Sequence, residues 1–292
     1  MLHEGEFTID EALVRRLISD QFVAWAELPL QRVRSSGTVN VIYRLGSELA
    51  IRLPRIPEFS GSVEREARWL PQFAGGLPLE IPEFVAVGAP AADYPSPWSV
   101  VRWIEGENAT PTTLANPSRA AVELGRFVAA LRTVDTRGGP TDSYRARPLA
   151  ERDIPTRRSI DEMAGELNQD VLIAAWEAAL SAPPWRGEPV WFHGDLHSGN
   201  LLARDGELVA VIDFGGCCVG EPSSDLIAAW WLFDETSRQV FRETVEVDDD
   251  SWSRGRGWAL SIALVALPYY VDSNPVFADM ARVAIRNVLA DM

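Results

Sequence analysis

The sequence contains no lysine, so all 27 of its lysine-plus-arginine residues are arginine. This absence excludes a P-loop of the form G-x-x-x-x-G-K-[ST], whose lysine is indispensable. It also excludes chemistry through a Schiff base on a lysine side chain. A coding bias toward arginine is a simpler cause of this composition than a functional demand.

Cysteine is scarce as well, with Cys217 and Cys218 side by side and no other. Adjacent side chains on an extended segment point in opposite directions, so this pair does not readily close a structural zinc site. We expect two reduced, packed thiols in a cytoplasmic protein. The N-terminal residues also lack the basic and apolar regions of a signal peptide, which supports the same expectation.

Positive charge is outnumbered, because 42 acidic residues give a formal net charge of −15. Such a surface disfavours binding to nucleic acid or to an anionic membrane, and it suits a cationic small molecule. Acidic surfaces also keep many proteins dispersed whatever they bind. The most apolar run, 258–271, is shorter than the roughly 20 residues that span a bilayer, so we expect a core helix there. Oligomeric state leaves no signal.

The hydrophobic periodicity changes along the chain. Before residue 103, the capping-box pattern from Thr8 to Glu11 predicts a first helix, and a second helix is expected over 63–73. Strands are expected over 30–34, 41–45, 48–53, 84–87 and 98–103. After Gly106, helices are expected over 120–134, 170–180, 223–233, 252–270 and 275–289. We predict an α+β fold with an antiparallel-sheet N-lobe (1–103) and a mainly helical C-lobe (104–292).

Three side chains have the spacing that phosphoryl transfer requires. Asp195 follows His193 and Gly194, Asn200 comes five residues later, and Asp213 comes 18 residues after Asp195. The reaction needs a carboxylate that accepts a hydroxyl proton and oxygen ligands that hold magnesium against the phosphates. The pair Asp205-Gly206 between apolar runs predicts a hairpin that returns Asp213 to the loop. Each tripeptide alone could be an ordinary turn, but their order favours a catalytic centre.

These segments resemble two signatures of the aminoglycoside phosphotransferase family. Residues 193–202 read His-Gly-Asp-Leu-His-Ser-Gly-Asn-Leu-Leu, and 211–215 read Val-Ile-Asp-Phe-Gly. Protein kinases have the related H-R-D-x-x-x-x-N and D-F-G sequences. The resemblance implies a bilobal protein-kinase-like fold, a catalytic base at Asp195, and magnesium ligands at Asn200 and Asp213. His193 would orient the loop without reacting.

The resemblance also implies a nucleotide site for ATP or GTP in the N-lobe. Arg52 would contact the α- and β-phosphates and pair with Glu66 or, as the second choice, with Glu64. Protein kinases have lysine at this position, and arginine is bulkier and never deprotonates. The substitution keeps open the alternative of a nucleotide-binding pseudokinase that acts as an interaction module.

Two further segments complete the expected nucleotide site. The turn 35–40, with Ser36 and Gly37, would cover the phosphates with backbone N–H groups. Val101 would face the adenine, and the main chain of Arg102 and Ile104 would bind its edge. Because that contact is through main chain, the sequence does not choose between ATP and GTP.

The acceptor is expected to be a small hydroxylated molecule, with aminoglycosides, macrolides and metabolic alcohols as open alternatives. The helices that would line its site carry several aromatic residues: Trp230, Trp231, Phe233, Trp258, Tyr269 and Tyr270. Most aromatic residues at helical spacing lie in a core. Acidic residues at 234–235 and 246–250 could attract an amino sugar, although such runs more often form a solvated face. Asp225, at a helix start, would either be a first-turn acid that the helix dipole stabilises or brace the catalytic loop.

Overall fold

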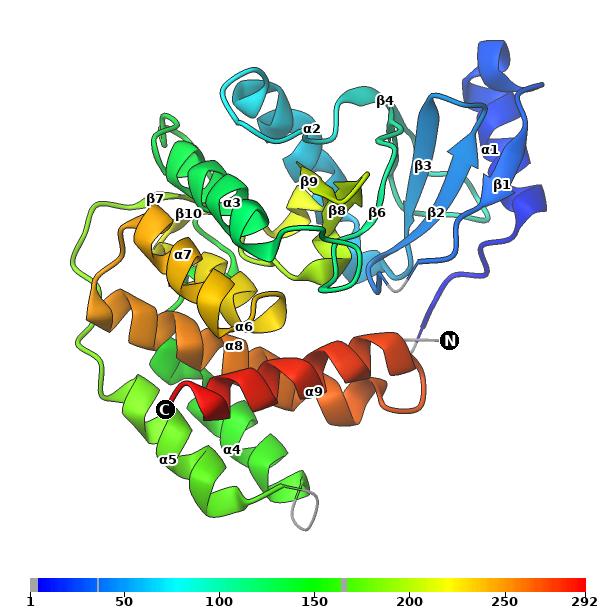
Figure 1. Ribbon diagram of the computed structural model, residues 1–292. Coiled ribbons are helices and arrows are strands. Elements are labelled where there is room, and N and C mark those ends of the chain that lie inside the picture. The colour runs from blue at the N-terminus through cyan, green and yellow to red at the C-terminus, as the bar shows by residue number, and fades with distance from the viewer. Residues whose placement is uncertain (1–4, 36, 164–166) are drawn as a thin grey trace. The chain divides into compact units, whose positions relative to one another are not determined.

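The computed structural model describes residues 5–35, 37–163 and 167–292. The chain forms two compact units (Figure 1). The sheet unit comprises Met1–Ala74, Glu80–Glu105 and Ile212–Gly215, and the helical unit comprises Gly75–Leu79, Gly106–Val211 and Gly216–Met292. The segment Ile212–Gly215 thus joins the sheet unit, although it follows the boundary expected after residue 103. Within the described residues, no helix combines the length and the hydropathy needed to cross a membrane.

A five-stranded antiparallel sheet forms the centre of the sheet unit. In spatial order its strands are β1 (Leu30–Arg32), β2 (Asn40–Leu45), β3 (Leu49–Pro54), β5 (Trp98–Arg102) and β4 (Phe84–Gly88). The middle strand, β3, is buried at every position. Its residues Ile51 and Leu53 pack into a core shared with the N-terminal helix. Because side chains alternate along a strand, Arg52 lies on the opposite face of the sheet.

Two helices cover the sheet, α1 (Glu11–Gln21) and α2 (Gly61–Phe73) (Figure 1). The N-cap of α1 is Asp10, whose Oδ1 accepts a hydrogen bond from the N–H of Leu13 at 2.8 Å. The capping box expected to begin at Thr8 is therefore wrong. Asp10 caps the helix because its carboxylate reaches the first turn directly ahead of the apolar residues at 13, 14, 17 and 18.

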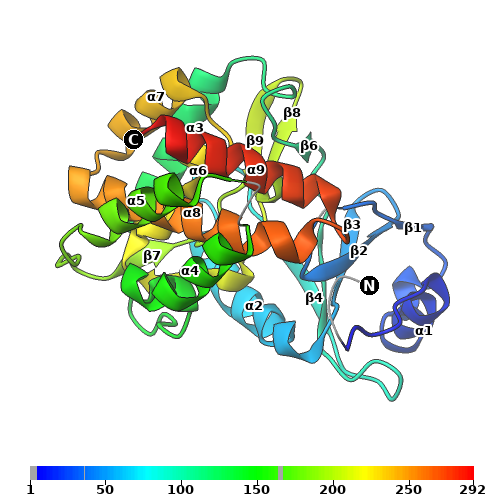
Figure 2. The same cartoon turned by 90° about the horizontal axis from the view of Figure 1, so that it is seen from below.

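The helical unit is built around one long buried helix. Its α-helices are α3 (Pro117–Arg132), α4 (Asp153–Glu162), α5 (Gln169–Leu180), α6 (Ala228–Trp231), α7 (Glu235–Val245), α8 (Asp249–Tyr270) and α9 (Pro275–Ala290). Helix α8 packs against α4, α5 and α9 (Figure 2), and α3 packs against α7. Residues 257–264 of α8 are all buried. The core helix expected at 258–271 is confirmed as part of α8, which ends at Tyr270.

Three expectations for this unit differ from the structure. The helix expected over 223–233 is a 3₁₀ helix, Pro222–Ile227, followed by the four-residue α6. Helix α4 lies where no helix was expected, and it tolerates Pro155 because its first turn needs no backbone donor there. Helix α7 was not predicted from the sequence, because its residues are mostly polar and lie between two acidic clusters.

Two small sheets lie in the helical unit. Strand β7 (Val190–Phe192) pairs with β10 (Cys218–Gly220), and β8 (Leu201–Arg204) lies between β9 (Glu207–Val211) and β6 (Glu107–Asn108). Asp205 and Gly206 have φ angles of 55° and 85°, which two-residue hairpin turns require, so the hairpin is confirmed. Both cysteines are buried and neither forms a disulfide, as expected. The remaining short 3₁₀ helices are Val23–Trp25, Pro57–Phe59, Tyr144–Ala146, Leu149–Arg152, Ser198–Asn200 and Phe214–Gly216.

Candidate active site

The loop that carries Asp195 connects β7 to β8 and is fixed from behind by a buried carboxylate. Asp225 is fully buried and accepts hydrogen bonds from the N–H groups of His193 and Gly194 at 3.0 and 2.6 Å. The imidazole Nδ1 of His193 accepts the N–H of Asp195 at 3.2 Å. Asp225 therefore braces the loop, which was one of its two expected roles.

Gly194 occupies a backbone conformation that explains why the sequence has glycine where protein kinases have arginine. Its φ angle is 86°, a left-handed value that favours glycine. A Cβ atom there would also lie 3.3 Å from the ring of Phe192. The bend turns the chain so that both N–H groups ahead of Asp195 reach Asp225.

The carboxylate of Asp195 accepts hydrogen bonds from three side chains. Its Oδ1 lies 2.8 Å from Nη2 of Arg145, and its Oδ2 lies 3.1 Å from Nδ2 of Asn200 and 3.3 Å from Nε2 of His197. The Nδ1 atom of His197 accepts the N–H of Gly199 at 3.0 Å, so the ring proton is on Nε2 and faces Asp195. A carboxylate offers about four acceptor sites. Three are taken, and the remaining one is on Oδ1.

These neighbours keep Asp195 ionised. Burial acts to raise the pKa of this carboxyl, because it disfavours the charged form. The His197 ring and the Arg145 guanidinium act in the opposite direction and hold the pKa well below its usual value. At neutral pH the group is therefore a carboxylate that can accept a proton.

Arg145 is the main site residue that the sequence analysis does not identify. It lies in the short helix Tyr144–Ala146, it is buried, and its guanidinium stacks 4.9 Å from the ring centroid of Tyr144. No motif surrounds it, and 50 residues separate it from the carboxylate it contacts. Only the tertiary fold brings the two together.

The side-chain amide of Asn200 is bonded to the catalytic loop through its nitrogen, while its oxygen is left for another partner. Its Nδ2 donates to the main-chain oxygen of Asp195 at 2.9 Å as well as to that residue's carboxylate. Its Oδ1 accepts no hydrogen bond from any residue in the described part of the chain. Amide oxygens of this kind are suitable ligands for a hard cation such as magnesium.

The sheet unit holds a second cluster, in which Arg52 binds two carboxylates. Nη1 of Arg52 lies 2.7 Å from Oε2 of Glu66, and Nη2 lies 2.9 Å from Oδ1 of Asp213. Arg52 thus pairs with Glu66, the expected partner, and α2 presents this residue to the buried strand. Burial acts to lower the pKa of Arg52, but the two carboxylates outweigh it and raise the pKa above its usual value.

The Arg52 cluster leaves one negative charge without a counter-charge, because one guanidinium faces two carboxylates. The Oδ2 atom of Asp213 accepts no hydrogen bond from the described residues, and its side chain is 27% exposed. The φ angle of Asp213 is 66°, a value that aspartate and asparagine tolerate better than most residues. Phe214 packs on Phe73, with ring centroids 6.1 Å apart, and holds this turn against α2. The charge and the free oxygen both suit a bound cation.

The remaining expected nucleotide contacts lie in the sheet unit as well. The N–H of Gly37 donates a hydrogen bond to Oγ of Ser35 at 2.9 Å. Ser36 lies outside the described residues. Val101 is buried in β5 opposite Ala50. The N–H of Arg102 donates to the oxygen of Glu83 at 2.9 Å, so a contact from Arg102 to a base would use its carbonyl oxygen.

The aromatic residues expected near the acceptor divide into two sets. Trp230, Trp231, Phe233 and Trp258 are buried, whereas Tyr269 is 53% exposed. The ring centroids of Trp231 and Phe277 lie 5.7 and 5.2 Å from that of His197, so an aromatic wall supports the catalytic loop.

Two of the acids considered for substrate attraction are helix caps. Asp234 accepts the N–H of Ser237 at 2.9 Å at the start of α7. Asp248 accepts the N–H of Ser251 at 2.6 Å at the start of α8. Their carboxylates are engaged in helix capping, which weakens the case for substrate contact.

The structure thus assembles two groups of the expected residues. Asp195 and Asn200 share the helical unit with Arg145 and His197, and Arg52, Glu66 and Asp213 share the sheet unit. One group offers a proton acceptor, and the other offers a cation beside unsatisfied negative charge. Among residues 5–35, 37–163 and 167–292, no cluster of three His, Cys, Asp or Glu side chains is arranged to hold a metal.

Comparison with known proteins identifies the family and similar folds. The model of the phosphotransferase enzyme family, APH, matches residues 31–258. The aminoglycoside phosphotransferase APH(2″)-IIIa, solved with GDP and kanamycin, has a TM-score of 0.77 at 16% identity, over 96% of this chain and 99% of that one. The macrolide 2′-phosphotransferase MphH from Brachybacterium faecium has a TM-score of 0.62 at 19% identity, over 94% and 97%. No curated protein sequence matches significantly.

The structural similarities establish the protein-kinase-like α+β fold that the two signatures imply. The family match covers well over half of the 292 residues and includes both signatures. The chain belongs to the APH phosphotransferase enzyme family.

Proposed function

We propose that this protein is a magnesium-dependent kinase that transfers the γ-phosphoryl group of ATP or GTP to a hydroxyl of a small molecule. The observation that carries the proposal is the geometry at Asp195. A half-buried carboxylate is kept ionised and, as far as the described residues go, has one acceptor site left, on Oδ1. An acceptor hydroxyl that donates to this site would be aligned to lose its proton as it attacks phosphorus.

The other residues have roles that follow from their contacts. Asn200 and Asp213 are the proposed magnesium ligands, because each has an oxygen without a hydrogen bond from the described residues. Bound magnesium would neutralise charge on the transferred phosphoryl group. Arg52 would contact the nucleotide phosphates, and Glu66 would hold it in place.

The acceptor is proposed to be a hydroxylated molecule of antibiotic type, such as an aminoglycoside or a macrolide. Relatives of similar fold have been solved with kanamycin, streptomycin or gentamicin, and others are macrolide phosphotransferases. The net charge of −15 favours a cationic acceptor. Phosphorylation of such a compound would give resistance, and the free cysteines agree with action in the cytoplasm.

A substrate panel tests the proposal. Aminoglycosides, macrolides and small metabolic alcohols would be incubated with the protein, magnesium, and either ATP or GTP, and nucleoside diphosphate release would be measured. We expect release that depends on both magnesium and one class of acceptor, with mass spectrometry showing one added phosphoryl group. Tight binding of magnesium-ATP without transfer to any acceptor would instead indicate a pseudokinase.

A further inference from the structure

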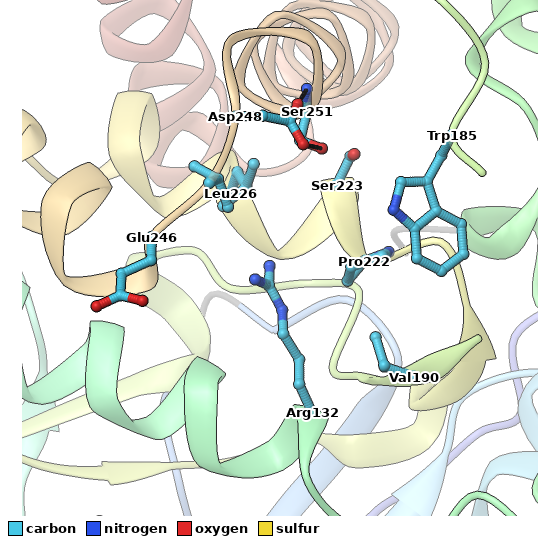
Figure 3. A pocket seen from close by; sticks show the side chains of 10 residues that line it. Arg132, Trp185, Val190, Pro222, Ser223, Leu226, Glu246, Asp248 and Ser251 are labelled. Carbon is cyan, nitrogen blue, oxygen red and sulfur yellow. Dashed lines mark hydrogen bonds between the residues drawn. The ribbon is translucent and has the colours of Figure 1, made fainter. Parts of the chain in front are cut away.

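A pocket of about 190 Å³ lies in the helical unit, apart from the residues assigned to phosphoryl transfer (Figure 3). It is bounded by the end of α3, the 3₁₀ helix Pro222–Ile227, and the connection from α7 to α8. Its apolar walls are formed by Trp185, Val190, Pro222 and Leu226. A cavity of about 150 Å³ is enough to hold benzene, so the pocket has room for a ring-sized molecule.

A single cation faces this pocket, and no described residue neutralises it directly. Figure 3 shows the guanidinium of Arg132 directed from α3 toward Ser223 and Leu226. Its Nε atom is buried without a hydrogen-bond partner, and the side chain forms no ion pair with the described residues. Burial lowers the pKa of Arg132, while the charge of Asp225 opposes this. The residue is partly buried, and a bound anion would give the shielded Nε the hydrogen-bond partner that it lacks among the described residues.

The neighbouring polar groups have their own partners. Ser223 donates its hydroxyl to Oε1 of Glu221 at 2.7 Å. Asp248 caps α8 by accepting from Ser251. Glu246 is exposed, and its carboxylate points away from the centre of the pocket (Figure 3). The pocket therefore offers one cation without an ion pair to the described residues, beside apolar side chains. Three acids lie around it, since Glu246 and Asp248 also line the pocket and the charge of Asp225 acts on Arg132.

The guanidinium, the acids and the apolar side chains of the pocket together indicate which kind of anion would fit. The planar guanidinium matches the two oxygens of a carboxylate and binds them through parallel hydrogen bonds. The nearby acids Asp225, Glu246 and Asp248 would repel a dianion such as phosphate more than a monoanion. The apolar walls, with the indole of Trp185, suit a hydrocarbon body. We propose that this pocket binds a small monocarboxylate with an aromatic or aliphatic body, and that Arg132 holds its carboxylate.

The probe is 4-fluorobenzoate, observed by ¹⁹F NMR during titration of the full-length protein. We expect saturable binding with a Kd of about 1 mM, which is typical for so small a ligand. The variant Arg132→Gln should weaken binding about 10- to 100-fold, as loss of a charge-assisted hydrogen bond does. The matched control is Arg126→Gln, which removes an exposed arginine from the same helix and should leave the Kd unchanged.

Three results would overturn the proposal. The first is no saturable binding by the wild-type protein, and the second is equal affinity in the wild type and Arg132→Gln. Either result would leave Arg132 as a cation that only offsets the dipole at the end of α3. The third is displacement of the probe by inorganic phosphate at equal concentration, which would contradict selection for a monocarboxylate.

A second variant covers the case in which Arg132→Gln does not fold. Arg132→Lys keeps the charge but not the planar fork, so we expect weakened binding in a protein with a near-normal melting temperature. Binding equal to that of the wild type in Arg132→Lys would contradict recognition through the fork. The site does not involve the phosphoryl-transfer residues, so the test is independent of the proposed kinase activity.

Discussion

The two groups of candidate site residues differ in how many carboxylates each guanidinium binds. In the cation cluster (Arg52, Glu66 and Asp213), one guanidinium serves two carboxylates, so the formal charges sum to −1. In the base cluster (Asp195, Arg145, His197 and Asn200), one guanidinium serves one carboxylate, and the formal charges of these two groups sum to zero. The cation cluster therefore has a formal excess of negative charge, whereas the base cluster keeps its carboxylate balanced and oriented. Under the proposed function, the excess charge suits a metal ion and the balanced carboxylate suits proton transfer, with Asn200 as the ligand that the base cluster would contribute.

The largest effect is expected from removal of the shared cation. Arg52→Gln leaves Glu66 and Asp213 without a counter-charge in a buried site, which typically costs about 3–5 kcal/mol. The free energy of unfolding in urea measures it. The control is Arg44→Gln on the adjacent strand, which breaks a more exposed pair with Glu105 and should cost less than about 1 kcal/mol. An equal loss of unfolding free energy in the two variants would show that Arg52 does not stabilise the fold by balancing the charges of Glu66 and Asp213.

The next effect concerns the unpaired charge of the cation cluster. Asp213→Asn removes it while keeping the shape and the left-handed backbone, so the fold should persist. We expect kcat/KM to fall more than about 100-fold, since even outer-shell partners of a metal contribute 10- to 100-fold. The magnesium dependence of the rate should move to higher concentrations.

A matched control exists for that substitution. Asp205 is an aspartate with a left-handed φ angle of 55°, placed in the hairpin turn. Asp205→Asn should leave kcat/KM and the magnesium dependence unchanged. An Asp213→Asn variant that behaved like this control would contradict the metal-binding role.

A smaller effect is expected in the base cluster. The guanidinium of Arg145 lowers the pKa of Asp195, so Arg145→Gln should raise that pKa toward its usual value. The variant should lose activity at a higher pH than the wild type as the pH falls, because protonated Asp195 cannot act as a base. We also expect kcat to drop about 10-fold at neutral pH, since imperfect positioning costs up to about 100-fold.

The pH profile of kcat/KM measures this change, and Arg147→Gln is the control because Arg147 is exposed two residues away. A parallel loss of activity at every pH, with no displacement of the acidic limb, would mean that Arg145 acts on the fold alone. The two profiles thus distinguish electrostatic from structural support of Asp195.

Features that depend on residues close together in the sequence could be predicted from the sequence. The roles of Asp195, Asn200 and Asp213 could be predicted because phosphoryl transfer requires particular residue types at short, fixed spacing. The pairing of Arg52 with Glu66 was also predictable, because a strand followed by a helix presents one face to the other. The hairpin at Asp205 was found through a local turn preference, for which neighbouring residues are sufficient.

The missed features depend on contacts between distant segments. Arg145 contacts a carboxylate 50 residues away, from a loop with no periodic pattern. The polar helix α7 packs on α3, and its own sequence has only three large apolar residues among polar and charged ones. Even a local rule failed at Thr8, because Asp10 offers a better-placed cap. Propensity is a weak guide where tertiary contacts decide.

The most direct test of the account replaces the proposed base itself. Asp195→Asn keeps the size of the side chain and removes its ability to take a proton. Transfer of labelled γ-phosphate to the acceptor identified by the panel would be measured for the wild type and the variant. The account predicts a fall in kcat of at least about 100-fold, within the range for a general base, with the melting temperature largely kept. Undiminished transfer by a folded Asp195→Asn variant would contradict it.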